Sequence, residues 1–342
     1  MKHCISQLEG AARRRARFVL GALLFICTPL LAAENPSAAA AGELTVDALS
    51  VVRVKSSAVR DARSSASLGN QREGTGVVID SNGLVLTIGY LITEADKVEL
   101  VTADGKVFPA AVVGSDTGTG MGLIKALTPL PVKPVDFGES AALAERELVL
   151  IVGFDGVAPA YVVSKRKFVG YWEYLLEEAI YTAPATVNWQ GAALLSREGK
   201  LLGIGSLVVG DAMGTRANIP GNMFVPIDLV KPVLGDMIAN GKSTAAPRPW
   251  IGVNTQEVQG NLIVTRVSPE SPADDAGLQQ GDVIVGIGGK AIQGQADFYT
   301  KLWATGEAGV DVPLEILKGN QVQQYTIKSR DRQSYFRSKP VY

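Results

Sequence analysis

The stretch GTGVVIDSNGLVLTIGY, residues 74–90, sets the pattern for most of this 342-residue chain. Two apolar runs flank a Ser-Asn-Gly tripeptide at 81–83, and an Asn-Gly pair between such runs is a strong signal for a β-hairpin. The second run, LVLTI, ends at Gly89, which places Tyr90 at a strand-to-turn corner. Turns held by a rigid strand often carry chemistry, so the role of Tyr90 needs an explanation.

The same design of short apolar runs separated by turn residues repeats along the chain and predicts an all-β structure for most of it. A first block of about six strands ends near residue 127, and a Pro-rich bridge, 128–140, leads into a second block. Two such blocks predict two packed β-barrels. The strands of the second block are expected at 147–154, 158–171, 177–183, 191–209 and 222–227.

A third unit is predicted after the barrels. Residues 228–241 read as an amphipathic helix, with Asp228 as its cap, and KSTAAPRP, 242–249, reads as a linker. Residues 250–330 then combine a capping box, SPAD at 271–274, with a strand at 281–287 and a helix over Ala296–Trp303. We therefore divide the chain into a lead-in (34–49), a double barrel (50–241), the third unit (250–330) and a tail (331–342).

The N-terminus has the features of a targeting segment. Basic residues between 2 and 17 precede the apolar run FVLGALLFICTPLLA, 18–32, and the pair Ala32–Ala33 offers a cleavage site. This pattern predicts a signal peptide, 1–33, and a periplasmic protein; an uncleaved inner-membrane anchor facing the periplasm is the alternative. Cleavage removes five of 33 Lys and Arg and one of 34 Asp and Glu, which leaves a net charge of about −5. No basic block remains, so no nucleic acid partner is expected.

Histidine and cysteine occur only in this targeting segment, as His3, Cys4 and Cys27. The mature chain therefore has neither residue type. Their absence from the sequence excludes a Ser-His-Asp triad, a Cys-His pair and a metal site built from His or Cys. We expect no metal and no cofactor.

The order and spacing of several motifs resemble the HtrA/DegP family of exported, trypsin-like serine proteases with PDZ domains. The resemblance covers about residues 50–330 and implies a mainly β fold, a chymotrypsin-like double β-barrel followed by one PDZ domain. The motifs that carry it are GTGVVIDSNGLVLT, DGKVFPAAVVGSD, DFGES, GKLLGI, MFVPIDLVKPVL and WIGV…SPADDAGLQQGDVIVGI.

The resemblance also locates the family's catalytic positions. Tyr90 stands where the family has its histidine, Gly120 where it has its aspartate, and Gln190 where it has its serine, with Asn188 and Trp189 in the oxyanion turn. Loss of a triad costs roughly 10⁶-fold in turnover. The sequence therefore predicts a pseudoenzyme of a serine endopeptidase family rather than an enzyme.

Other roles for these residues stay open at this point. Tyr90 either packs into the space left by the triad or binds a ligand, and Trp189 and Gln190 either plug the old cleft or line a peptide-binding groove. The basic strip SKRKF, 164–168, reads as a solvated strand edge or a contact for an acidic partner. Three nearby carboxylates are candidates to neutralise it, those of Glu173, Glu177 and Glu178.

The PDZ-like unit keeps the residues for peptide recognition that the family implies. In PDZ domains, backbone amides of one loop hold a terminal carboxylate while the peptide adds to a sheet edge. The alternative is a structural domain that packs on the barrels. The resemblance assigns the carboxylate loop and edge to Trp250, Ile251, Gly252, Val253 and Thr255, and the apolar pocket to Phe298, Leu302 and Trp303.

These residues together predict a function in protein binding and quality control. We expect a catalytically inactive HtrA-like protein that binds polypeptides or protein C-termini as a chaperone, adaptor or regulator in the cell envelope. The alternative is an active serine-type endopeptidase of the HtrA class with a rebuilt site. The resemblance further implies active HtrA-type homologues as possible partners and a homotrimer as a possible assembly.

Overall fold

The computed structural model describes residues 49–337. The predicted signal peptide, almost all of the predicted lead-in and the last five residues of the predicted tail lie outside the described residues. Within residues 49–337, no helix is long and apolar enough to cross a membrane.

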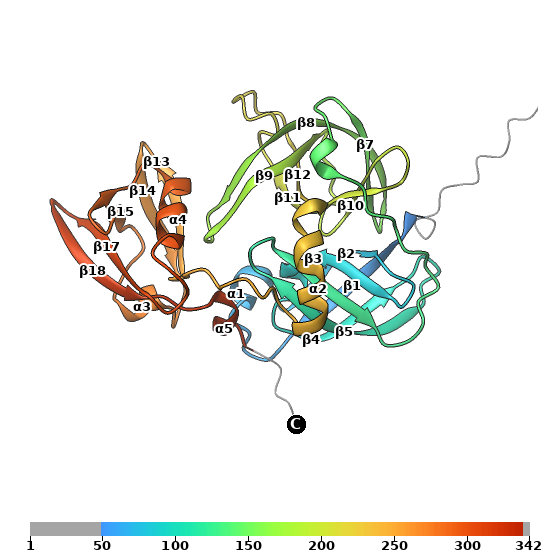
Figure 1. Ribbon diagram of the computed structural model, residues 1–342, viewed down its shortest axis with the longest axis horizontal. Coiled ribbons are helices and arrows are strands. Elements are labelled where there is room, and N and C mark those ends of the chain that lie inside the picture. Colours follow the sequence, from blue (N-terminus) through green and yellow to red (C-terminus); the bar gives the residue numbers. More distant parts are fainter. Residues whose placement is uncertain (1–48, 338–342) are drawn as a thin grey trace, which may run out of the picture. The chain divides into compact units, whose positions relative to one another are not determined.

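The first barrel closes six strands in the order β1-β2-β3-β6-β5-β4 (Figure 1). The predicted hairpin forms around residues 81–83, because β2 and β3 pair through Val77 with Leu86 and Val78 with Val85. The strands are β1 (Val51–Ala58), β2 (Gln71–Val78), β3 (Leu84–Ile88), β4 (Ala95–Val101), β5 (Val107–Asp116) and β6 (Met121–Ala126).

The second barrel also closes six strands, in the order β10-β11-β12-β9-β8-β7. One apolar core cluster contains buried side chains of both barrels, among them Leu86 from the first and Met223 from the second, so the two barrels pack directly on each other. The strands are β7 (Leu148–Gly153), β8 (Gly156–Gly170), β9 (Tyr174–Ala183), β10 (Ala193–Leu195), β11 (Leu201–Val209) and β12 (Gly221–Pro226).

Helices are short around the barrels. The predicted helix over 228–241 is α2 (Lys231–Asn240), and it begins later than expected because a 3₁₀ turn, η4 (Ile227–Leu229), precedes it. Asp228 is not its cap; its carboxylate instead accepts a hydrogen bond from the N–H of Ala141 at 2.8 Å. The other short helices are α1 (Ser65–Leu68), η2 (Gly89–Leu91) and η3 (Ser140–Ala142).

The third unit is a sheet in the order β13-β14-β15-β17-β18, with β16 paired to β15, around its own apolar core. Its elements are β13 (Val253–Val258), β14 (Asn261–Val267), α3 (Pro272–Asp275), β15 (Val283–Ile287), β16 (Lys290–Ala291), α4 (Gln295–Trp303), β17 (Asp311–Lys318) and β18 (Gln321–Lys328). The predicted fold class, a mainly β double barrel followed by a PDZ domain, is confirmed.

Two segments connect the barrels to the PDZ domain. Strands β8 and β9 form a long hairpin that reaches from the second barrel towards α4 (Figure 1). Its tip is the turn of residues 171–173. The second segment follows β18 and forms a short helix, α5 (Arg332–Tyr335), within the predicted tail.

Candidate functional site

Tyr90 lies in η2, directly after β3, and joins the two barrels. Its ring packs half-buried against the common core, and its hydroxyl donates a hydrogen bond to the carbonyl of Ser206 on β11 at 3.0 Å. Burial raises the pKa of the Tyr90 hydroxyl above its ordinary value, so the group is a neutral donor near pH 7 rather than a base. This geometry assigns Tyr90 a packing and bridging contact.

Gly120 sits in a backbone conformation that favours glycine. Its φ is +75°, which side-chain-bearing residues rarely adopt. A Cβ on Gly120 would lie 3.1 Å from the hydroxyl oxygen of Tyr174, whose ring covers this position. The Tyr174 hydroxyl is fixed in turn, because it donates to the carbonyl of Thr119 at 2.6 Å.

Gln190 lies at the start of a tight turn between the barrels. Its carbonyl accepts a hydrogen bond from the N–H of Thr75 at 2.8 Å. Gly191 follows with φ +75°, and a Cβ there would meet the Thr75 carbonyl at 2.1 Å, so only glycine fits this close approach. The Gly191 N–H donates to the carbonyl of Gly205 at 2.9 Å and is therefore engaged within the turn.

The predicted oxyanion turn, residues 188–191, has one residue in the left-handed conformation. The described residues with positive φ include Gly191 but neither Asn188 nor Trp189. The Asn188 N–H points to the hydroxyl of Thr186 at 3.4 Å, and the Trp189 carbonyl accepts from the N–H of Ala192 at 3.1 Å. Asn188 thus does not reproduce the left-handed conformation that would keep a glycine-like turn.

A cavity lies beside Gln190 and Asn188, and charged side chains line it. Arg53 in this cavity pairs with the carboxylates of Glu73 and Asp155 at once. The cavity is also lined by Thr75, whose hydroxyl oxygen accepts a hydrogen bond from the N–H of Phe154 at 3.0 Å. Neither Tyr90 nor Trp189 is among the lining residues, so these two positions do not share one cavity with Gln190.

The PDZ loop holds a carboxylate, and that carboxylate belongs to this chain. The side chain of Glu173, at the tip of the β8–β9 hairpin, accepts hydrogen bonds from the N–H groups of Ile251 at 3.1 Å, Gly252 at 2.7 Å and Val253 at 2.9 Å. These are three of the residues that the sequence assigned to the carboxylate loop. Three convergent backbone N–H groups form a concave site for an anion.

The hairpin tip also pairs with the edge strand of the PDZ sheet. The N–H of Thr255 on β13 donates to the carbonyl of Tyr171 at 2.9 Å. From α4, the Tyr299 hydroxyl donates to the carbonyl of Gly170 at 2.8 Å and accepts from the N–H of Glu173 at 3.1 Å. Both walls of the groove, β13 and α4, therefore contact the hairpin.

Burial sets the electrostatics at Glu173. Desolvation raises the pKa of its carboxyl to about 7, while the three backbone hydrogen bonds and the nearby positive charge of Arg332 act in the opposite direction. The hydrogen bonds and the Arg332 charge therefore offset only part of the free-energy cost of removing water from the charged Glu173 carboxylate. Loss of water around a carboxylate is expensive unless hydrogen bonds and an opposite charge replace it.

The other residues predicted for peptide binding have different surroundings. Phe298 and Leu302 are fully buried in the PDZ core, and Trp303 stacks on Tyr299 with ring centres 5.6 Å apart. Trp250 does not contribute its amide to the carboxylate site, because its N–H donates to the carbonyl of Arg330 at 3.0 Å. Peptide binding by this set of residues stays a prediction.

The position of Glu173 contradicts the expectation that it neutralises the basic strip, residues 164–168. Two of the three carboxylates expected to neutralise the basic strip do so, since Lys165 pairs with Glu178 at 3.4 Å and Lys167 with Glu177 at 2.9 Å. Glu173 does not contact the strip, because its turn carries it into the PDZ loop. A signal for this was present in the sequence: Glu173 stands alone in the aromatic and apolar stretch YWEYLL, where a charge needs a specific partner.

Tyr171, Tyr299 and Arg332, which complete this site, were not identified from the sequence. Tyr171 and Tyr299 contribute through a backbone carbonyl and a hydroxyl whose partners lie far away in the chain. In residues 49–337 no group of three or more His, Cys, Asp and Glu side chains is placed to hold a metal ion.

Comparison with known proteins supports this architecture. Residues 74–204 match the family model of the trypsin-like peptidase domain, and residues 249–328 match that of the PDZ domain. The putative serine protease HhoA of Synechocystis sp. is 25% identical over 288 residues, which cover 75% of this chain and 70% of that protein. The periplasmic pH-dependent serine endoprotease DegQ of Escherichia coli is 28% identical over 261 residues, which cover 72% of this chain. The match spans 57% of DegQ, little more than half its length.

A solved structure of an HtrA-type protease, an AlgW variant with a tripeptide, is similar in fold. It superimposes with a TM-score of 0.51 at 20% identity and covers 86% of this chain and 95% of the other.

These relatives overturn the prediction that the chain is not an enzyme. They are named as serine proteases and endoproteases, which points to an enzyme. The prediction failed because it took the expected loss of one arrangement of groups, a Ser-His-Asp triad, to exclude hydrolysis by any other arrangement.

The two matched domains occur in this order in the fold described above. The chain is a member of the HtrA-type family, with a trypsin-like peptidase domain followed by one PDZ domain.

Proposed function

We propose that this protein acts on polypeptides in the periplasm as a serine-type endopeptidase of the HtrA class with a rebuilt site, and that its PDZ domain selects polypeptides by their C-terminal carboxylate. The periplasmic location follows relatives such as DegQ, which is named periplasmic. The narrower roles as chaperone, adaptor or regulator, the homotrimer and a partnership with active HtrA-type homologues remain predictions.

The observation that carries the proposal is the carboxylate held by three backbone N–H groups at Ile251, Gly252 and Val253. Recognition through backbone amides needs a loop of the right shape and does not depend on particular side chains. A peptide's terminal carboxylate has the same chemical group and therefore suits the same site.

The endopeptidase half of the proposal rests on the relatives and needs a group other than Gln190, because a side-chain amide is not a nucleophile. Among the residues that line the cavity beside Gln190, Thr75 is the one with a hydroxyl, and Glu73 and Asp155 supply carboxylates. We therefore propose that the Thr75 hydroxyl takes the place of a serine hydroxyl as the nucleophile of the rebuilt site.

The test is cleavage of unfolded casein by the purified protein and by Thr75→Val, which keeps the shape and removes the hydroxyl. Thr182→Val is the matched control, because the Thr182 hydroxyl is buried and has no hydrogen-bond partner among the described residues. Cleavage that Thr75→Val loses and Thr182→Val keeps supports the proposal. Absence of cleavage by the parent protein after stringent purification contradicts the endopeptidase half, and cleavage by Thr75→Val contradicts the assignment of Thr75.

The recognition half is tested separately with a labelled peptide that ends in an apolar residue and a free carboxylate. Fluorescence anisotropy should show binding of this peptide and at least tenfold weaker binding of its C-terminal amide, since the amide lacks the charge. Equal binding of the two peptides would contradict recognition of the carboxylate.

A further inference from the structure

We infer that the β8–β9 turn is an internal ligand of the PDZ domain, with the Glu173 side-chain carboxylate in the place of a polypeptide's C-terminal carboxylate. The groove is therefore closed by the chain itself, and a polypeptide with a free C-terminus must displace this turn to bind. The inference deepens the proposed function and rests on its recognition half.

The register of the contacts supports this inference. The Glu173 carboxylate accepts a hydrogen bond from the N–H of Val253. Two residues earlier in the hairpin, the carbonyl of Tyr171 accepts one from the N–H of Thr255, which lies two residues after Val253 on β13. The two segments step by two residues in opposite directions, which is how an added strand runs antiparallel along a sheet edge. Addition of a strand to an exposed edge, with a carboxylate captured by backbone amides, is a recurring mode of peptide recognition.

Apolar burial adds to the polar contacts. Leu175, at the start of β9, is 7% exposed and belongs to the core cluster of the PDZ domain together with residues such as Phe298 and Leu302. Val169, at the end of β8, packs against the same cluster. The hairpin therefore places side chains on the groove in addition to a carboxylate, as a bound peptide would.

The burial of Glu173 favours displacement of the turn by a competing peptide. The Glu173 carboxylate is buried, and its raised pKa of about 7 means that hydrogen bonds and Arg332 do not fully compensate its desolvation. A competing peptide brings its own carboxylate and returns Glu173 to water. An internal ligand reduces the apparent affinity for added peptide by the fraction of molecules in which the groove is open.

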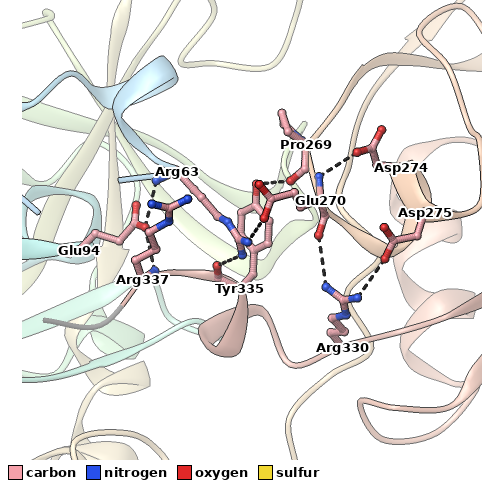
Figure 2. Close-up of polar contacts among 9 residues, drawn as sticks. All are labelled: Arg63, Glu94, Pro269, Glu270, Asp274, Asp275, Arg330, Tyr335 and Arg337. Carbon is pink, nitrogen blue, oxygen red and sulfur yellow. Dashed lines mark hydrogen bonds and ion pairs between the residues drawn. The ribbon is translucent and has the colours of Figure 1, made fainter. Parts of the chain in front are cut away.

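A second contact holds the PDZ domain to the first barrel. Figure 2 shows Arg63 between Tyr335 and Glu270, with its guanidinium 4.5 Å from the centre of the Tyr335 ring and paired with the Glu270 carboxylate. The Tyr335 hydroxyl donates to the carbonyl of Pro269 at 2.9 Å. We call this set of residues, Arg63, Pro269, Glu270 and Tyr335, the α5 clamp; it keeps the groove near the hairpin tip.

The experiment compares peptide affinity in the parent protein, in Glu173→Ala and in Glu178→Ala. Glu178 is the matched control, since it lies on the same hairpin, is exposed and pairs with Lys165. Glu173→Ala removes the charge-assisted hydrogen bonds that hold the turn in the loop, so it should bind the free-carboxylate peptide at least about tenfold more tightly. Glu178→Ala should bind it as the parent does.

Hydrogen exchange of the amides of Ile251, Gly252, Val253 and Thr255, measured without peptide, separates the inference from the proposed function. Exchange that is at least tenfold faster in Glu173→Ala than in the parent supports the internal ligand, even if no variant binds the peptide and the recognition half of the proposed function fails. Unchanged exchange in a folded Glu173→Ala overturns the inference, and so does measurable peptide binding with the same affinity in this variant as in the parent. Tyr299→Phe, which loses the hydroxyl contacts to the turn, should shift exchange in the same direction and covers the case in which Glu173→Ala does not fold.

Discussion

The carboxylate of Glu173 accepts a hydrogen bond from the N–H of Gly252 at 2.7 Å, although the two residues lie 79 positions apart in the chain. This contact joins the second barrel to the PDZ domain at the loop that the sequence assigned to carboxylate binding. It makes the state of the groove depend on a residue of the peptidase domain.

The first prediction concerns pH. The Glu173 carboxyl has a pKa of about 7 when docked, against an ordinary value of 4.5 in water. The docked state therefore binds the proton more tightly, so docking is strongest below about pH 4.5 and weakens as pH rises towards 7. Affinity for a free-carboxylate peptide should increase over this range, by at most about tenfold per pH unit.

The groups that face Glu173 do not produce this profile themselves. Burial lowers the pKa of the Arg332 guanidinium, yet an arginine keeps its charge across this range, and burial raises the pKa values of Tyr299 and Tyr174 further above neutrality. Anisotropy titrations between pH 5 and 8 should thus show the increase in the parent protein and a flat profile in Glu173→Ala. The same slope in both proteins would assign the effect to another group.

The second prediction concerns Gly120. Gly120→Ala forces a side chain into φ +75° and towards the Tyr174 hydroxyl, whereas Gly105→Ala meets φ +80° with no atom within 4 Å. The left-handed conformation costs about 1–2 kcal/mol in both variants. Gly120→Ala should lose at least about 1 kcal/mol more in the free energy of unfolding, measured with urea, because of the contact. Equal losses would show that Tyr174 moves away freely.

The third prediction concerns Tyr90. Tyr90→Phe removes the hydroxyl that donates to Ser206 and should lower the free energy of unfolding by about 0.5–1.5 kcal/mol. Tyr161→Phe is the control, because Tyr161 is 53% exposed, and should change it by less than about 0.5 kcal/mol. Thermal unfolding of both variants checks this, and a Tyr90→Phe protein as stable as the parent would argue against a bridge between the barrels.

The fourth prediction concerns the α5 clamp. Arg63→Ala removes the ion pair with Glu270 and the contact with the Tyr335 ring, both partly exposed, so each is worth about 1 kcal/mol or less. The PDZ domain should loosen, and peptide affinity should rise two- to fivefold, less than in Glu173→Ala. Arg60→Ala, at an exposed neighbouring position, should leave the affinity unchanged. A weaker affinity in Arg63→Ala would mean that the clamp helps the groove to bind.

The sequence predicted the fold well because turn signals are local. The Asn-Gly pair at 82–83 fixes one hairpin, and similar signals mark the strands of both barrels and of the PDZ domain. The start of α2 was predicted too early, because the apolar period continues through η4, and periodicity does not separate a 3₁₀ turn from an α-helix.

The candidate site was predictable only in part. The loop Ile251–Val253 could be recognised from its motif, but its occupant could not, because contact between Glu173 and Gly252 depends on how a long hairpin and a separate domain meet. The role given to Glu173 relied on its closeness in sequence to the basic strip, and tertiary packing overrode that local argument.

A crystal structure of the protein with a bound free-carboxylate peptide tests the central claim most directly. The account predicts the peptide carboxylate within hydrogen-bond distance of the N–H groups of Ile251, Gly252 and Val253, with the Glu173 side chain displaced from them. A peptide bound elsewhere while Glu173 keeps its contacts with these three N–H groups would contradict it.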